Sequence, residues 1–379
     1  MLKKLNTLFA VLVLVTMLIS PKPAAAQAPD CAKPDVFCVG LVTDVGKIDD
    51  KSFNQSTWEG VKQAETDLGA YVQYIETTDS KDYAKNISTF ADEGYDVIVT
   101  VGFALGEASI AAAKQYPKVS FIGVDQFQTE TIANLAGLVF PEDQAGFLVG
   151  ALAAQMTKTK KIGGVFGTDA VPPVWRFGEG YRAGALYINP KIKIFIVYHN
   201  DVGFDKTFTD PEWGAATAKS MIDKGADVIF GGGGKTGNGA VIAAVQNGVY
   251  GIGVDTDQYF TLPEAQSKLL SSALKLLTPG TFELIQKAKA GAFPGGNFSG
   301  KGGFAPYHDT AGDVPAAVDA KMQEINRALL DGSLKTNVSP VKPAEAPAAA
   351  PAGIPTWAIV LIVVVVVVVV VFFFMRKKK

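Results

Sequence analysis

Two stretches of the chain repeat each other: residues 92–106 read DEGYDVIVTVGFALG, and residues 223–237 read DKGADVIFGGGGKTG. Seven Asp, Gly, Val and Ile positions match at the same spacing in the two copies. Each copy precedes an Ala-rich segment with helical spacing, and then a short apolar segment that ends in Gly-Val-Asp, at 123–125 and at 253–255. The repeated unit is therefore a strand, a Gly-rich turn, a helix and a second strand.

The strands of this unit are typical of a parallel sheet. Residues 97–101 and 119–124 are almost continuously apolar, as in strands covered by helices on both faces. Helical spacing predicts intervening helices at 54–68, 81–93, 105–115, 144–156, 211–224 and 239–247. The alternation predicts an α/β protein with two doubly wound parallel-sheet lobes. We place the lobes at 37–140, with later crossover segments at about 258–300, and at 141–338.

Three aspartates stand where predicted strands end: Asp44, Asp125 and Asp255. Ligands of doubly wound sheets bind beyond the carboxyl ends of the strands. We therefore expect these carboxylates to face a cleft between the lobes. The alternative interpretation is that each aspartate only caps the helix that follows it.

The N-terminal end is typical of a secretory signal peptide. Lys3 and Lys4 precede an apolar run at 5–19, and three alanines at 24–26 offer a cleavage site. We therefore assign residues 1–26 to a signal peptide, with an uncleaved amphipathic anchor as the alternative. A secreted body gives Cys31 and Cys38 an oxidising compartment, where they form either a disulfide or two free thiols.

The C-terminal end predicts a membrane anchor. Residues 357–375 are uncharged and almost wholly apolar, long enough to span a hydrocarbon core, and residues 376–379 are basic. We predict a transmembrane helix at 356–375, a cytoplasmic tail at 376–379 and a Pro/Ala-rich stalk at 339–355. A cleaved sorting tail is the alternative. The predicted location is the cell membrane, by a single pass, with the body extracellular or periplasmic.

Charge and composition exclude several classes of function. The net charge is −2, and without the seven basic residues of the two ends 28 basic residues stand against 37 acidic ones. Such an acidic body does not read a phosphate backbone, so we expect no nucleic-acid partner. With 2 His and 2 Cys, the chain also lacks the ligands of zinc fingers and iron–sulfur clusters. We expect no metal and no cofactor.

The motifs of common enzymes are absent from the sequence. The run GGGGKT at 231–236 resembles a phosphate-binding loop, but Ile229 stands where that motif requires glycine. No G-x-S-x-G turn is present, and His199 and His308 are the whole supply of imidazole. We predict no catalytic residues and a protein that is not an enzyme.

A specific resemblance lies in DVGKIDDKSFN at 44–54, which resembles the opening signature of the basic membrane protein family of substrate-binding proteins. Purine nucleoside receptors belong to this family. Further similar segments include GVD at 123–125, FGEGY at 177–181, TGNG at 236–239 and VDTDQ at 254–258. The resemblance extends over about 37–338.

The resemblance implies a type I periplasmic-binding fold that delivers nucleosides to an ATP-driven importer. It implies a base held between two Phe rings, Phe53 and either Phe208 or Phe204. Asp44, Asn54 and Asp125 would read the base, and Asp255 with Lys275 would hold the ribose hydroxyls. The implied partners are a nucleoside, a permease and an ATPase, and we expect the receptor to be a monomer.

Two other functions remain open. A receptor of the same fold could bind a sugar or a signalling furanose, which needs one flat ring where a base needs two. A secreted hydrolase is the third candidate, and turnover of the ligand would identify it.

Overall fold

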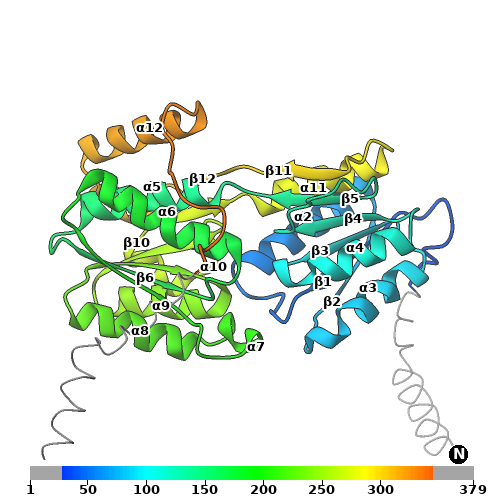
Figure 1. The fold of residues 1–379 in the computed structure, drawn as a ribbon, viewed down its shortest axis with the longest axis horizontal. Helices are drawn as coiled ribbons and strands as arrows, with labels where there is room; N and C mark the ends of the chain where they lie inside the picture. The colour runs from blue at the N-terminus through cyan, green and yellow to red at the C-terminus, as the bar shows by residue number, and fades with distance from the viewer. Residues whose placement is uncertain (1–27, 345–379) are drawn as a thin grey trace, which may run out of the picture. The chain divides into compact units, whose positions relative to one another are not determined.

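The computed structural model describes residues 28–344, which form two α/β lobes, each built on a six-stranded sheet (Figure 1). The expected signal peptide at 1–26 and the expected transmembrane helix at 356–375 lie outside these residues. Within 28–344 no helix is both long enough and apolar enough to cross a bilayer.

The first sheet has the order β11-β5-β4-β3-β1-β2 and is parallel throughout. Its strands are β1 (Cys38–Thr43), β2 (Tyr71–Ile75), β3 (Val97–Val101), β4 (Ser120–Val124), β5 (Leu135–Val139) and β11 (Gly296–Ser299). Its helices are α2 (Phe53–Leu68), α3 (Tyr83–Asp92), α4 (Gly106–Gln115) and α11 (Leu277–Lys289), with short 3₁₀ turns at Ser80–Asp82 and Phe103–Leu105. The disulfide Cys31–Cys38 joins the start of the described chain to β1.

The second sheet has the order β12-β10-β9-β8-β6-β7, and only β12 runs antiparallel to its neighbour. Its strands are β6 (Lys161–Phe166), β7 (Lys193–Tyr198), β8 (Val228–Gly232), β9 (Tyr250–Asp255), β10 (Leu269–Lys275) and β12 (Gly302–Phe304). Its helices are α5 (Glu142–Met156), α6 (Pro172–Ile188), α7 (Phe204–Thr207), α8 (Pro211–Asp223), α9 (Gly234–Gln246), α10 (Gln258–Thr261) and α12 (Ala316–Leu330). Two 3₁₀ turns lie at Pro263–Lys268 and His308–Asp313. The predicted two-lobe α/β fold with parallel sheets is confirmed.

The chain passes between the two sheets three times: between β5 and β6, between β10 and β11, and between β11 and β12. The segment that returns to the first sheet carries α11, which packs on α2. A Cβ atom on Gly60 of α2 would lie 2.6 Å from the carbonyl oxygen of Thr278, so only glycine permits this close approach.

Helices α5 and α6 lie side by side on the second sheet. Gly150 of α5 and Gly184 of α6 each face the backbone of the other helix so closely that a side chain would collide with it. The contact continues to the first turns of both helices, where Gly146 faces the backbone of Phe177 and Gly180 faces the backbone of Asp143. These turns bring Glu142 and Arg176 together as a salt bridge beside the crossing from β5.

Candidate functional site

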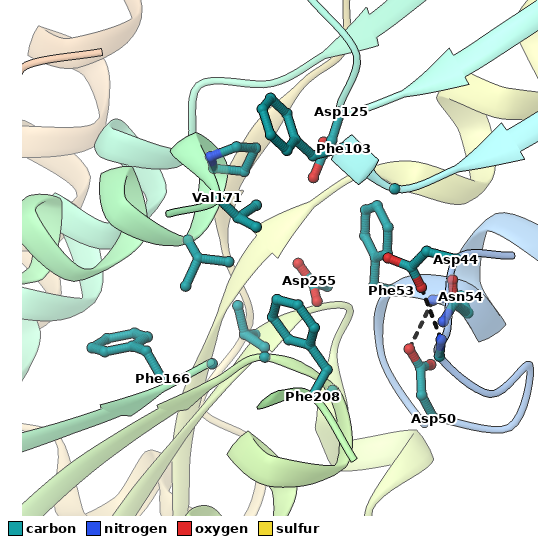
Figure 2. A pocket seen from close by; sticks show the side chains of 18 of the residues that line it. Asp44, Asp50, Phe53, Asn54, Phe103, Asp125, Phe166, Val171, Phe208 and Asp255 are labelled. Carbon is teal, nitrogen blue, oxygen red and sulfur yellow. Dashed lines mark hydrogen bonds between the residues drawn. The ribbon is translucent and has the colours of Figure 1, made fainter. Parts of the chain in front are cut away.

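One pocket gathers side chains from both lobes at the carboxyl ends of the two sheets (Figure 2). It holds about 770 Å³ of space free of protein atoms, part of it continuous with solvent, within the range of small-molecule sites. All the residues that the sequence singled out line it: Asp44, Phe53, Asn54, Asp125, Phe208, Asp255 and Lys275. Phe204, the alternative to Phe208, lines it as well.

The sequence repeat reappears in the backbone of this pocket. Asp125 and Asp255 end corresponding strands of the two lobes, and both adopt left-handed backbone conformations, with φ of 63° and 66°. Gly102 and Gly233 follow β3 and β8, with φ of 116° and 112°. A side chain on Gly102 would collide with the carboxylate of Asp44. The two lobes therefore present matching carboxylates to one space.

Three lysines line the pocket, Lys47, Lys235 and Lys275, and of these Lys275 is buried. Its Nζ lies 2.6 and 2.8 Å from the two carboxylate oxygens of Asp125 and 3.0 Å from Oε1 of Glu142, in an ion pair without hydrogen-bond geometry. Glu142 also pairs with Arg176. Both Lys275 and Glu142 are buried. Lys275 and the partly exposed Arg176 thus face the carboxylates of Asp125 and Glu142, which offsets part of the cost of removing these charges from water.

Asp255 has a different direct partner. Ser52 Oγ donates a hydrogen bond of 2.6 Å to Asp255 Oδ2, and both residues are buried. Burial raises the pKa of Asp255, and the charge of Lys275 and the bond from Ser52 partly offset that rise. Lys275 therefore acts on Asp255 through its field, while its hydrogen bonds go to Asp125.

Six phenylalanines line the pocket, and the two singled out from the sequence come from different lobes, Phe53 from α2 and Phe208 from the segment after α7 (Figure 2). Lys275 Nζ lies 5.1 Å from the centre of the Phe53 ring. Phe208 packs so close to Gly167 that a side chain there would collide with the ring. Phe204 meets Phe208 edge-on, with ring centres 5.5 Å apart, so it supports the Phe208 ring from one side.

Asp44 and Asn54 supply hydrogen-bond acceptors beside Phe53 (Figure 2). Asp44 Oδ1 accepts from the Gly46 amide at 3.0 Å. Burial raises the pKa of Asp44 to about 6, the Gly46 bond lowers it, and the negative charge of Asp125 raises it further. Asn54 Oδ1 is buried and accepts no hydrogen bond from the described residues. This end of the pocket is therefore suited to a ligand that brings its own donors.

Asp50 holds the start of α2 next to the pocket. Its carboxylate accepts from the backbone amides of Ser52, Asn54 and Gln55 at 2.9, 2.9 and 3.1 Å. These are amides that a helix N-terminus leaves without partners. Burial raises the pKa of Asp50 to about 7; the three amides lower it, and the charge of Asp255 raises it.

The loop before α2 also bonds to the second lobe. Asp50 O accepts from Asn238 Nδ2 at 2.8 Å, and Lys51 O accepts from Thr261 Oγ1 at 2.8 Å. Lys235 Nζ lies 2.7 Å from Asp49 Oδ1. Lys51 takes a left-handed conformation, with φ of 61°. Together with the hydrogen bond from Ser52 to Asp255, these contacts hold the loop 49–52 of the first lobe against the second lobe at the pocket.

Sequence reasoning missed several of these groups. Glu142, Ser52 and Asp50 are not among the site residues predicted from the sequence. The available signal was the position of Asp50 and Ser52 directly before a predicted helix, which is where capping residues stand. Within 28–344 no cluster of His, Cys, Asp and Glu is arranged to hold a metal ion.

Known proteins are similar to this chain over most of its length. Residues 37–300 match the family model of the ABC transporter substrate-binding protein PnrA-like family. A Listeria monocytogenes protein described as a CD4+ T-cell-stimulating antigen is 33% identical over 80% of this chain and 89% of its own. The ABC transporter nucleoside-binding protein BmpA of Lactococcus lactis is 31% identical over 76% of this chain and 84% of its own.

Among solved structures, a solute-binding protein of an ABC transporter system from Aeropyrum pernix shares the fold, with a TM-score of 0.71 and 24% identity over 79% of this chain and 92% of that one. The matched family consists of substrate-binding proteins rather than enzymes. Because the family model spans most of the chain and close relatives cover both lobes, the chain belongs to the PnrA-like family of ABC transporter substrate-binding proteins.

Proposed function

We propose that this protein captures a purine nucleoside outside the cytoplasm and presents it to the permease and ATPase of an ABC importer. The observation that carries the proposal is the pocket at the carboxyl ends of both sheets, where aromatic rings from both lobes, acceptor side chains and the buried Lys275 converge. The name of the relative from Lactococcus lactis, a nucleoside-binding protein, supports the same ligand class.

The two halves of a nucleoside correspond to two parts of the pocket. Phe53 and Phe208 come from opposite lobes and are suited to stacking on the two faces of a planar base. Asp44 and the unpaired Asn54 Oδ1 accept from the N–H groups of its edge. Asp125, held by Lys275, adds a further carboxylate for the base.

The ribose hydroxyls are suited to Asp255. Its carboxylate uses one oxygen for Ser52 and keeps the other for a hydroxyl donor. The charge of Lys275 offsets part of the burial cost of this carboxylate. A ligand without hydroxyl groups leaves that acceptor unpaired and binds more weakly.

Binding is proposed to proceed by closure of the lobes on the ligand. The loop 49–52 bonds to the second lobe at several points, and these bonds cannot persist when the lobes separate. The closed form is then the one that a permease can distinguish from an empty receptor.

The body is proposed to stay at the cell surface through the apolar C-terminal segment at 356–375, after removal of the signal peptide at 1–26. The hydrophobic length and the basic end of that segment support this anchor. Protease added to intact cells should release the body by cutting the stalk at 339–355. Complete protection of the body would contradict the proposed topology.

Calorimetry on the full-length protein in detergent tests the ligand. Guanosine, inosine or adenosine should bind, while ribose and inorganic phosphate should bind far more weakly. At a hundred times its dissociation constant, the nucleoside should raise the free energy of unfolding by about 2.7 kcal/mol. Binding of a sugar without a base, and no heat with any nucleoside, would instead favour the sugar-receptor alternative.

A further inference from the structure

His199 occupies a buried position behind the pocket wall that carries Phe208. It directly follows β7, and about 1% of its surface is exposed. Its ring stacks on Trp213 of α8, with ring centres 3.8 Å apart and planes 12° apart. It does not line the pocket and therefore cannot touch a ligand there. Contact with a ligand therefore does not explain why this buried imidazole makes such defined contacts.

Both nitrogens of this ring face carboxylates. Nδ1 lies 2.7 Å from Asp201 Oδ1, and Nε2 lies 3.4 Å from Asp210 Oδ2. Asp201 and Asp210 begin and end the segment 201–210, which contains α7 and both candidate stacking rings, Phe204 and Phe208. The imidazole therefore ties the two ends of this segment to one point.

Further bonds converge on the same point. The carbonyl oxygen of His199 accepts from Thr207 Oγ1 at 2.7 Å, one residue before Phe208. Asp210 caps α8 by accepting from the Trp213 amide at 3.0 Å, and its own amide donates to Thr236 Oγ1 at 2.9 Å. All of the residues at 200–206 are exposed to solvent or only partly buried. The segment has little core of its own to hold it, so its conformation depends on these bonds.

We propose that His199 is a positioning residue for Phe208. By binding both ends of the segment 201–210, it fixes the separation between the Phe208 ring and the Phe53 ring. This inference rests on the proposed function, because it assigns to Phe208 the stacking role. The physical reason is that a stacked base needs two rings at a set separation. A ring on a loose segment loses that separation and much of the stacking contribution.

A double-mutant cycle tests the proposal through binding of guanosine to the full-length protein. The variants are His199→Ala, Phe208→Ala and the two combined, with Asp255→Ala as a second partner. His199→Ala should weaken binding by on the order of tenfold. The combined variant with Phe208→Ala should be no weaker than Phe208→Ala alone, because the positioned ring is already gone. In the variant that combines His199→Ala with Asp255→Ala, the fold-losses of affinity of the two single variants should multiply in full.

The chain offers a matched control and a conservative variant. His308, the other histidine of the sequence, also stacks on an aromatic ring, Tyr259 at 4.1 Å, and bonds to an aspartate, Asp257 at 2.7 Å. It does not line the pocket, so His308→Ala should leave the affinity unchanged. His199→Asn can still donate to Asp201 and should recover part of the affinity. It also serves as the test variant if His199→Ala does not fold.

The outcomes distinguish a failure of the proposed function from a failure of the positioning role of His199. No binding of any nucleoside by the wild type would overturn the proposed function and this inference with it. Normal binding by Phe208→Ala would overturn the role of Phe208 but leave a nucleoside receptor. If Phe208→Ala weakens binding and the loss from His199→Ala simply multiplies with it, positioning through Phe208 is wrong while the proposed function stands.

Discussion

Lys275 and Asp125 form a buried ion pair between residues 150 positions apart in the chain, with Nζ 2.6 and 2.8 Å from the two carboxylate oxygens. Lys275 ends β10 of the second sheet, and Asp125 follows β4 of the first. The pair therefore connects the two lobes inside the pocket. It sits beside the point where the chain crosses from β10 to α11.

Replacing Lys275 by Met should destabilise the ligand-free protein strongly. The change leaves the carboxylates of Asp125 and Glu142 buried, with only Arg176 remaining as a cation beside Glu142. Removal of one partner of a buried pair costs about 3–5 kcal/mol. Urea unfolding followed by circular dichroism measures this loss.

The double variant Asp125→Asn/Lys275→Met removes a carboxylate together with the lysine and should recover part of the stability. Lys287→Met is the matched control, because Lys287 forms a partly exposed pair with Glu283 one helical turn away. Such pairs contribute about 0–1 kcal/mol. Equal losses from Lys275→Met and Lys287→Met would show that the buried cluster does not stabilise the fold.

Replacing Phe53 by Ala should weaken nucleoside binding by about 1–3 kcal/mol, the range found for the loss of one base-stacking ring. Affinity for free ribose should change little, because the sugar does not use that ring. Calorimetry with guanosine and ribose checks both statements. Phe260→Ala is the control, since Phe260 is 71% exposed and lies outside the pocket.

Because of the titration of Asp50, the free energy of unfolding should fall as the pH rises from about 4 to about 7. Burial raises its pKa from the ordinary 3.8 to about 7. In this window the folded state keeps a proton on Asp50 that the unfolded state has lost. The folded state then binds more protons, so the free energy of unfolding decreases with increasing pH.

Asp50→Asn should flatten that decrease, as measured by urea unfolding at several pH values. It should also lower stability at every pH, because an amide caps the start of α2 less well than a carboxyl group. Asp49→Asn is the neighbouring control. The bond from Lys235 lowers the pKa of Asp49, so this control should not flatten the decrease. Identical slopes in the wild type and Asp50→Asn would contradict the raised pKa.

The repeat explains why the two lobes and the facing aspartates could be predicted from sequence. A strand, Gly-rich turn, helix and strand in each copy place Asp125 and Asp255 after equivalent strands, and both take the same left-handed conformation. A periodic pattern is local, and the ends of parallel strands meet at one edge. The residues that the sequence singled out therefore line one pocket.

The elements that were predicted poorly depend on distant contacts. Helix α9 begins at Gly234, five residues before the predicted start at 239, and it packs closely on α8, since a side chain on Gly239 would collide with Pro211. The partners of Glu142 lie at Arg176 and Lys275, positions that no local pattern connects to it. Local propensity cannot predict such packing.

Ser52→Ala should accelerate release of the nucleoside. Ser52 belongs to the first lobe and Asp255 to the second, so their hydrogen bond of 2.6 Å stabilises the closed form directly. Its loss leaves a buried carboxylate oxygen without its donor, at a cost of about 1–3 kcal/mol. Because the bond exists only with the lobes together, the cost falls on the closed state, and the dissociation rate should rise by about 5- to 150-fold.

Ser52→Thr keeps the hydroxyl group, so its affinity for the nucleoside should be close to that of the wild type. Ser88→Ala, which removes an exposed hydroxyl on α3, should have no effect. Stopped-flow release of guanosine measures the rate. Small-angle scattering at saturating ligand should show a smaller radius of gyration for the wild type than without ligand. An unchanged release rate in Ser52→Ala would mean that closure does not depend on this bond.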